Sequence, residues 1–149
     1  MRIAIDTSVV VGLINPRDLW HGTALNLRTA LIDAGHEAVY FDCVAAEAIS
    51  VITRRLHEKR LTAEIETLLD RLGMQTPKAI INWILPDVPR LYDDVLGLVR
   101  STGGMLNFND ALIALACQER AIPAIASFDS DFDSVGWLRR VSEPDHLHA

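Results

Sequence analysis

The residues of this sequence that are best placed to do chemistry are acids at the boundaries of predicted elements. Asp6 follows a short apolar run that predicts a strand, and a second apolar run begins directly after it. In open α/β sheets, ligands bind at the carboxyl ends of the strands, and Asp6 would lie at such an end. Because Asp, Ser and Thr also cap helix starts, Asp6 on its own is compatible with either a site or a cap.

Further acids lie at two predicted helix starts and after another predicted strand. Asp110 is in the first turn of its helix, where it could complement the helix dipole. Glu47 is in the first turn of another helix, where it could simply face solvent. Asp129, Asp131 and Asp133 follow a predicted strand and could form a polar turn. Each acid therefore also has a purely structural explanation.

The combination of these acids is more informative than any one of them. Carboxylates gathered at one sheet edge repel one another, at a cost of about 4 kcal/mol for a pair about 4 Å apart at an effective dielectric constant of about 20. A fold keeps such a cluster when protons or a cation neutralise it. The sequence offers oxygen ligands and has no His or Cys at metal-ligand spacing, which favours Mg²⁺ or Mn²⁺ over Zn²⁺. Such an ion can activate water for phosphodiester hydrolysis.

The composition is typical of one globular domain. The chain has 149 residues, 50% hydrophobic and 23% charged, and no apolar run reaches the roughly 18 residues that a membrane span requires. Asp6 interrupts the N-terminal apolar run, so we expect no signal peptide and a cytoplasmic protein. The net charge of -6 disfavours a broad grip on nucleic acid, although a metal ion could make an acidic site bind phosphate. Cys43 and Cys117 are expected to be buried, reduced thiols.

Hydrophobic periodicity predicts alternating strands and helices, and therefore an α/β fold with a parallel sheet covered by helices on both faces. Asp42 and Asn107 are predicted helix caps, and Gly73 is predicted to end the fourth helix. The apolar stripes of the second and third helices include Ile32 and Ile49. The ambiguous run 79–85 could contain a short strand at 84–85, because the residue before a proline favours an extended conformation. Helices are predicted at 9–14, 20–34, 44–59, 62–72, 89–100 and 108–120, and strands at 3–5, 38–41, 123–127 and 139–141.

Four segments that contain these acids, taken in chain order, resemble the motifs of PIN-domain nucleases. Within that superfamily the sequence resembles VapC-type toxins of toxin–antitoxin pairs. The resemblance covers nearly the whole chain, and one departure is Ser127, where the family usually has Thr. The matching segments are Ile5-Asp6-Thr7-Ser8, Val44-Ala45-Ala46-Glu47-Ala48, Asn109-Asp110-Ala111-Leu112-Ile113-Ala114 and Ser127-Phe128-Asp129-Ser130-Asp131-Phe132.

The resemblance implies a fold, an activity and a set of site residues. The fold would be a PIN-like three-layer α/β/α arrangement with a central parallel sheet of four to five short strands, a single domain over 1–142 and a mobile polar tail over 143–149. The activity would be that of a Mg²⁺- or Mn²⁺-dependent endoribonuclease. The implied catalytic residues are Asp6, Glu47, Asp110 and Asp129, with Asp6, Asp110 and Asp129 as metal ligands and Thr7, Ser8, Ser127 and Asp131 in supporting positions. Asp131 could also replace Asp129.

The resemblance further implies an RNA substrate, a homodimer and a small antitoxin that blocks the site, often by inserting a basic side chain among the acids. Arg54 and Arg55 are candidate RNA-binding residues, although they could equally form a solvated helix end. Trp20, Trp83 and Trp137 could be core or interface residues, and the core is favoured for two of them.

Other functions remain as alternatives. A PIN nuclease could act in RNA processing rather than as a toxin, and a non-catalytic interaction protein could use the same scaffold, although such a protein would be expected to have lost some of the acids. A phosphatase of the haloacid dehalogenase type also begins with a strand and an Asp. That class needs a second Asp two residues later, where this sequence has Ser8, and a downstream Lys among acids that is missing here.

Overall fold

A parallel sheet of five short strands forms the centre of the computed structural model, which describes residues 1–148. Every pair of neighbouring strands runs in parallel. The sheet order β3-β2-β1-β4-β5 places β1 in the middle, between the second and fourth strands of the sequence. The strands are β1 (Arg2–Ile5), β2 (Glu37–Phe41), β3 (Ile81–Asn82), β4 (Ala124–Ala126) and β5 (Arg139–Val141).

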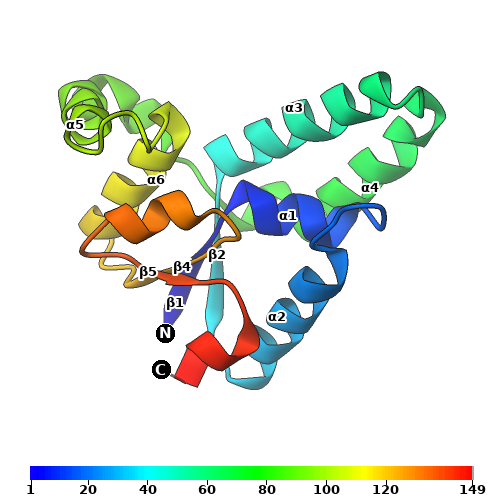
Figure 1. Cartoon of the computed structure of the whole chain (residues 1–149), viewed down its shortest axis with the longest axis horizontal. Helices are drawn as coiled ribbons and strands as arrows, with labels where there is room; N and C mark the ends of the chain where they lie inside the picture. The colour runs from blue at the N-terminus through cyan, green and yellow to red at the C-terminus, as the bar shows by residue number, and fades with distance from the viewer. Residues whose placement is uncertain (149) are drawn as a thin grey trace.

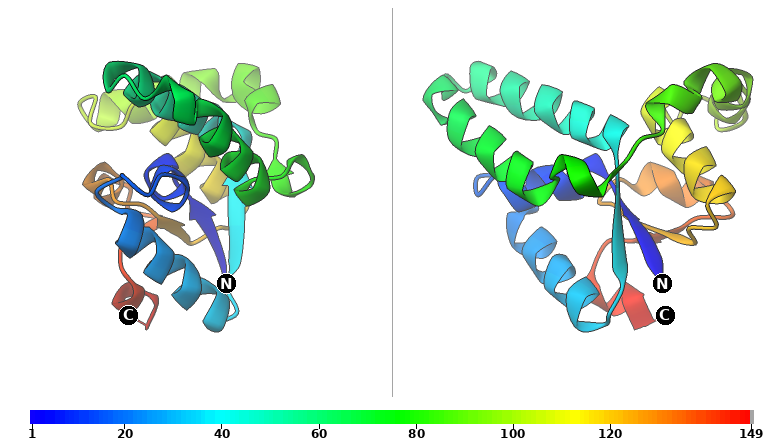
Figure 2. Two further views of the ribbon diagram at one scale, coloured as in Figure 1. Left: turned by 90° about the vertical axis from the view of Figure 1, so that its right-hand side faces the viewer. Right: turned by 180° about the vertical axis from the view of Figure 1, so that it is seen from behind.

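Helices cover both faces of this sheet. Figure 1 shows α1 to α4 on one side of β2 and α5 and α6 on the other, and the view from behind in Figure 2 shows the same separation. The three-layer α/β/α fold predicted from the sequence is therefore confirmed. None of the helices described in residues 1–148 has the length and apolar content needed to cross a membrane. The helices are α1 (Thr7–Ile14), α2 (His21–Asp33), α3 (Asp42–Glu58), α4 (Ile65–Gln75), α5 (Val88–Ser101) and α6 (Phe108–Glu119).

The register of the central strands brings two polar segments to one edge of the sheet. Ile5 of β1 lies opposite Ala126 of β4, so Asp6 and Ser127 both follow directly at the carboxyl edge. The Asp6 N–H donates to the Ala126 carbonyl at 3.0 Å, which extends the ladder to the last residue before α1. Since β1 and β4 are almost fully buried, the first polar side chains after them emerge at this edge.

The predicted strand at 84–85 is wrong, and the reason is a side chain from another element. The strand β3 lies earlier, at Ile81–Asn82, and Leu85 begins a short 3₁₀ turn. The buried Asp42 carboxylate accepts hydrogen bonds from the backbone N–H groups of Ile84 and Leu85, each at 3.0 Å. Those N–H groups are therefore already bonded to a side chain. Asp42 is also the first residue of α3 rather than its cap, since the N-cap position falls on Phe41.

Several other local predictions fail where packing overrides sequence pattern. The helix α4 passes through Gly73 and ends at Gln75. Ile32 is 67% exposed, Ile49 is exposed, and all three tryptophans are exposed rather than two of them being core residues. In the segment expected to be a mobile tail, Pro144–His148 form a short 3₁₀ turn with Leu147 buried, while residue 149 lies outside the described residues.

Candidate active site

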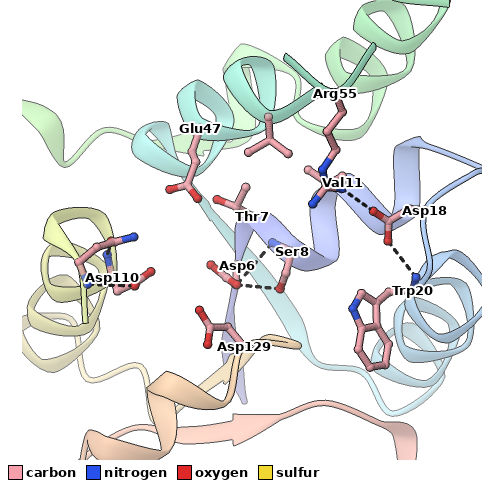
Figure 3. Close-up of a pocket in the computed structure, with 12 residues that line it drawn as sticks. Asp6, Thr7, Ser8, Val11, Asp18, Trp20, Glu47, Arg55, Asp110 and Asp129 are labelled. Carbon is pink, nitrogen blue, oxygen red and sulfur yellow. Dashed lines mark hydrogen bonds and ion pairs between the residues drawn. The ribbon is translucent and has the colours of Figure 1, made fainter. Parts of the chain in front are cut away.

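Four acids from four different parts of the fold line one pocket of about 210 Å³. Asp6 lies between β1 and α1, Glu47 is in α3, Asp110 is in α6, and Asp129 follows β4. In Figure 3, Asp110 lies at one end of the pocket, with Glu47, Asp6 and Asp129 beside it. The four acids that the motifs singled out are thus brought together in space, although they are far apart in the chain.

Two serine hydroxyls hold the Asp6 carboxylate in place. Its Oδ2 atom accepts hydrogen bonds from Ser8 Oγ at 2.8 Å and from Ser127 Oγ at 2.7 Å. In turn, Ser8 Oγ accepts from the Phe128 N–H and Ser127 Oγ accepts from the Asp129 N–H, both at 3.0 Å. Burial raises the pKa of Asp6, and the hydrogen bonds from the two serines oppose this effect. Asp6 also caps α1, so the same carboxylate serves as a helix cap and lines the acidic pocket.

Asp110 is likewise both a cap residue and a member of the acidic pocket. Its carboxylate accepts from the Asn107 N–H at 3.2 Å, while the Asn107 side chain accepts from the Asp110 N–H at 2.9 Å. Burial raises the pKa of Asp110 to about 7, and the negative charges of Asp6, Asp129 and Glu47 add to the increase. The hydrogen bond from Asn107 acts in the opposite direction. Without a cation, Asp110 is therefore only partly ionised at neutral pH.

Glu47 is oriented by a residue that sequence reasoning did not assign to the site. Asn109 Nδ2 donates to Glu47 Oε2 at 2.8 Å, and the half-buried Glu47 side chain faces the pocket rather than only solvent. The two residues are 62 positions apart, so no local spacing indicates the contact. The position of Asn109 beside Asp110 in the third motif is the only signal of its role.

The three acids after β4 differ in their surroundings. Asp129 lines the pocket, and its Oδ1 atom accepts from the Asp131 N–H at 2.9 Å. The charge of Asp129 raises the pKa of Asp131, which is not among the residues that line the pocket. Asp133 forms an ion pair with Arg140 at 2.8 Å. Within this segment the geometry favours Asp129 over Asp131 as the acid facing the other three.

The two candidate RNA-binding arginines differ in position. Arg55 lines the pocket, where Nη1 donates to Asp18 Oδ2 at 2.8 Å, whereas Arg54 lies 3.9 Å from Glu58 on the exposed surface of α3. Trp20 lines the same end of the pocket. Asp18 and Trp20 were not predicted as site residues. The bond of Asp18 to Arg55 and the position of Trp20 at the pocket both depend on how the 15–20 segment folds.

The cysteines offer no alternative nucleophile. Cys43 and Cys117 are buried and free, as expected from their apolar surroundings. Burial raises the pKa of both thiols to about 12, so neither is a thiolate at neutral pH. Neither cysteine is among the residues that line the acidic pocket.

Comparison with known proteins identifies the family of the chain. The model of the PIN domain family matches residues 3–138. The chain belongs to the PIN-domain family. The crystal structure of Mycobacterium tuberculosis VapC20, described as a sarcin-ricin loop cleaving toxin, matches with a TM-score of 0.68 at 21% sequence identity, over 91% of this chain and 95% of VapC20. At this identity the likeness concerns the fold. A search of curated proteins found no match.

The pocket of this PIN domain has the donor chemistry that a hard divalent cation requires. The acidic side chains of the pocket offer carboxylate oxygens as donors. Thr7 Oγ1 is a further buried oxygen at the same pocket, and it has no hydrogen-bond partner within residues 1–148. No group of three or more acid, His or Cys side chains in residues 1–148 is arranged to hold one ion directly. The carboxylates and the hydroxyl are oxygen donors, which suit a hard divalent cation that keeps several waters. A buried hydroxyl such as that of Thr7 could hydrogen-bond one of those waters.

Proposed function

We propose that this PIN domain is a Mg²⁺- or Mn²⁺-dependent endoribonuclease and acts as the toxin of a toxin–antitoxin pair. The observation that carries the proposal is the convergence of Asp6, Glu47, Asp110 and Asp129 on one pocket, where burial raises the pKa of Asp110 to about 7 and the charges of the other three acids add to the increase. A fold retains acids that repel one another in this way when a bound cation relieves the repulsion. The membership of the chain in the PIN-domain family supports the same conclusion.

Each residue of the pocket has a distinct role in this proposal. Asp6, Asp110 and Asp129 would bind the ion, directly or through water, and Ser8 and Ser127 fix the orientation of Asp6. Glu47, held by Asn109, would complete the coordination or accept a hydrogen bond from the attacking water. Bound Mg²⁺ or Mn²⁺ would supply the positive charge that activates water and stabilises the charge that develops on the phosphate. Asp131 would support Asp129 rather than replace it.

The proposal includes partners and a place of action. The substrate would be RNA, the protein would form a homodimer in the cytoplasm, and a small antitoxin would block the acidic pocket with a basic side chain. The fold likeness to VapC20, whose description names it a toxin, supports this assignment over a role in RNA processing. A short reading frame beside the gene, encoding a DNA-binding protein that inhibits cleavage, is the expected companion.

RNA cleavage by the purified protein tests the proposal directly. The panel of RNAs includes a synthetic sarcin-ricin hairpin, because VapC20 is described as cleaving that loop. We expect cleavage with Mg²⁺ or Mn²⁺, none with chelator, and a loss of roughly 100-fold or more in Asp6→Asn and in Asp110→Asn. Asp93→Asn, at an exposed position of α5, is the matched control and should cleave normally.

The variants also separate the fourth acid from its neighbour. Asp129→Asn should lose activity to a similar degree, whereas Asp131→Asn should retain most of it, because only Asp129 lines the pocket. Cleavage that survives Asp6→Asn and Asp110→Asn would come from a contaminant and would refute the site. A folded protein that cleaves no RNA of the panel and binds no Mg²⁺ or Mn²⁺ would refute the proposed activity.

A further inference from the structure

Beside the acids, the pocket carries an aromatic pair that the proposed cleavage does not explain. The rings of Trp20 and Phe128 are stacked, with centroids 4.8 Å apart and an interplanar angle of 16°. Phe128 is half-buried against the core, whereas Trp20 is 43% exposed and lines the pocket. Figure 3 shows Trp20 and Arg55 at one end of the pocket and Asp110 at the other, with Asp6 and Ser8 between them. Stacking on Phe128 uses one face of the indole and leaves the ring only partly covered.

The backbone of each aromatic residue is bonded to a side chain that lines the pocket. The Trp20 backbone N–H donates to Asp18 Oδ1 at 2.9 Å. The Phe128 N–H donates to Ser8 Oγ at 3.0 Å, and Ser8 Oγ donates to Asp6 Oδ2 at 2.8 Å. A single hydroxyl group therefore connects the backbone under the lower ring to the central carboxylate of the pocket. This chain of hydrogen bonds links the Phe128 backbone to Asp6, and Trp20 stacks on the Phe128 ring.

A positively charged group lines the same end of the pocket as the exposed indole. Asp18 holds Arg55 with its second carboxylate oxygen at 2.8 Å, and the Asp18 side chain is 8% exposed while that of Arg55 is 45% exposed. Asp18 thus bonds to both the Trp20 backbone and the Arg55 guanidinium, while the Arg55 side chain as a whole stays partly exposed. Beyond this point, Arg17 and Lys59 line an adjoining groove together with Trp20, Arg55 and the acid Glu58, and Arg17 is paired with Glu64 at 2.7 Å. A strand leaving the acidic pocket at this end would meet Lys59 and the partly exposed Arg55.

We propose that Trp20, supported from below by Phe128, is a stacking platform for an unpaired base of the RNA strand, and that Arg55 contacts an adjacent phosphate. The inference rests on the proposed function, since it requires that the pocket acts on RNA. Stacking on an aromatic side chain tolerates any base but requires that the base is not stacked within a duplex. The platform would therefore restrict cleavage to single-stranded segments and to nucleotides turned out of a loop. A Trp20 that merely covers Phe128 would have no such effect on RNA.

Binding to RNA with and without bases distinguishes a platform from a cover. The probes are fluorescein-labelled 12-nucleotide oligoadenylate and a 12-unit ribose-phosphate chain of equal charge that lacks bases, measured by anisotropy with Mg²⁺ in an Asp110→Asn background that prevents cleavage. Trp20→Leu should weaken oligoadenylate binding about 10-fold, the loss expected for one stacked base, and leave the baseless chain unchanged. Arg55→Met should weaken both. Trp20→Tyr should restore most of the affinity, which excludes a loss caused by misfolding.

The matched control is Trp83→Leu, because Trp83 is another exposed tryptophan but lies outside the pocket, and both affinities should stay unchanged. The platform is refuted if Trp20→Leu weakens both probes equally, or weakens neither, which is the result expected if Trp20 instead docks a protein. Failure of the proposed function is a separate result, namely a wild-type protein that cleaves no RNA of the panel. If the wild type cleaves RNA but Trp20→Leu changes the two affinities no more than Trp83→Leu does, the proposed function stands and only the platform is refuted.

Discussion

At the level of single residues, Asp110 is the group whose ionisation most clearly opposes folding. Its pKa is raised from 3.8 to about 7, chiefly by burial and further by the charges of three neighbouring acids. Between these two values the folded protein keeps a proton that the unfolded chain has lost. The contribution to stability is therefore fully present below about pH 4 and is lost as the pH rises through 7.

Unfolding by urea in chelator tests this sign. We expect the wild type to lose stability relative to Asp110→Asn as the pH rises from 4 to 8, by up to about 4 kcal/mol, because the amide cannot ionise. Asp6 should add a slope of the same sign in both proteins, since its pKa is also raised. The difference between wild type and variant isolates Asp110, and a difference that does not vary with pH would contradict the prediction. Asp93→Asn controls for loss of a surface charge.

Residues that line the acidic pocket could be predicted from the sequence where the signal is local. Asp6, Glu47, Asp110 and Asp129 each follow a strand or open a helix, and those positions are visible in the chain. Asn109 was not predicted because its role depends on a contact 62 positions away. Asp18 was not predicted for the same reason, since it holds an arginine 37 positions away. No spacing along the chain encodes such contacts.

At the level of elements, the junction between β2 and α3 depends on one buried carboxylate. Asp42 accepts hydrogen bonds from the backbone N–H groups of Cys43, Ile84 and Leu85, each at 3.0 Å. It thereby connects the start of α3, which carries Glu47, to the segment between β3 and α5. This contact also explains why the element boundaries near residue 84 could not be read from hydrophobic pattern and a proline alone.

Replacing this carboxylate should destabilise the fold without touching the pocket. Asp42→Ala leaves the buried Ile84 N–H without its partner, and hydrogen bonds to a charged group contribute about 1.5–3 kcal/mol each. We expect a loss of about 3 kcal/mol in the free energy of unfolding, measured by urea denaturation, against a change below about 0.5 kcal/mol for the exposed Asp93→Ala. An Asp42→Ala protein as stable as the control would show that water replaces these bonds.

Other helix boundaries show the same difference between local signals and contacts made by the fold. The start of α6 was predicted correctly, because Asn107 and Asp110 form a capping box whose two members are three residues apart. The end of α4 was not, because Gly73 lies within the helix and the chain continues to Gln75. Local side-chain-to-backbone contacts are visible in a sequence, whereas packing between elements decides the remaining ends.

At the level of the whole molecule, the sheet topology gathers the acids. The strand order puts β1 between β2 and β4, so the loops that carry Asp6 and Asp129 meet at one edge, and α3 and α6 begin beside it. Alternating strands and helices were enough to predict this parallel arrangement. An ion shared by these acids would therefore connect the first and last thirds of the chain.

That connection predicts that metal stabilises the entire fold. An ion present at about 100 times its dissociation constant adds about 2.7 kcal/mol, which for a domain of this size raises the melting temperature by roughly 5–10 °C. We expect this increase with Mg²⁺ or Mn²⁺ in calorimetry at pH 7.5, compared with NaCl at equal ionic strength. Asp6→Asn and Asp129→Asn should lose most of it, and Asp93→Asn should keep it. An equal increase in all four proteins would mean that the ions act by screening charge across the surface, and that the acidic pocket holds none of them.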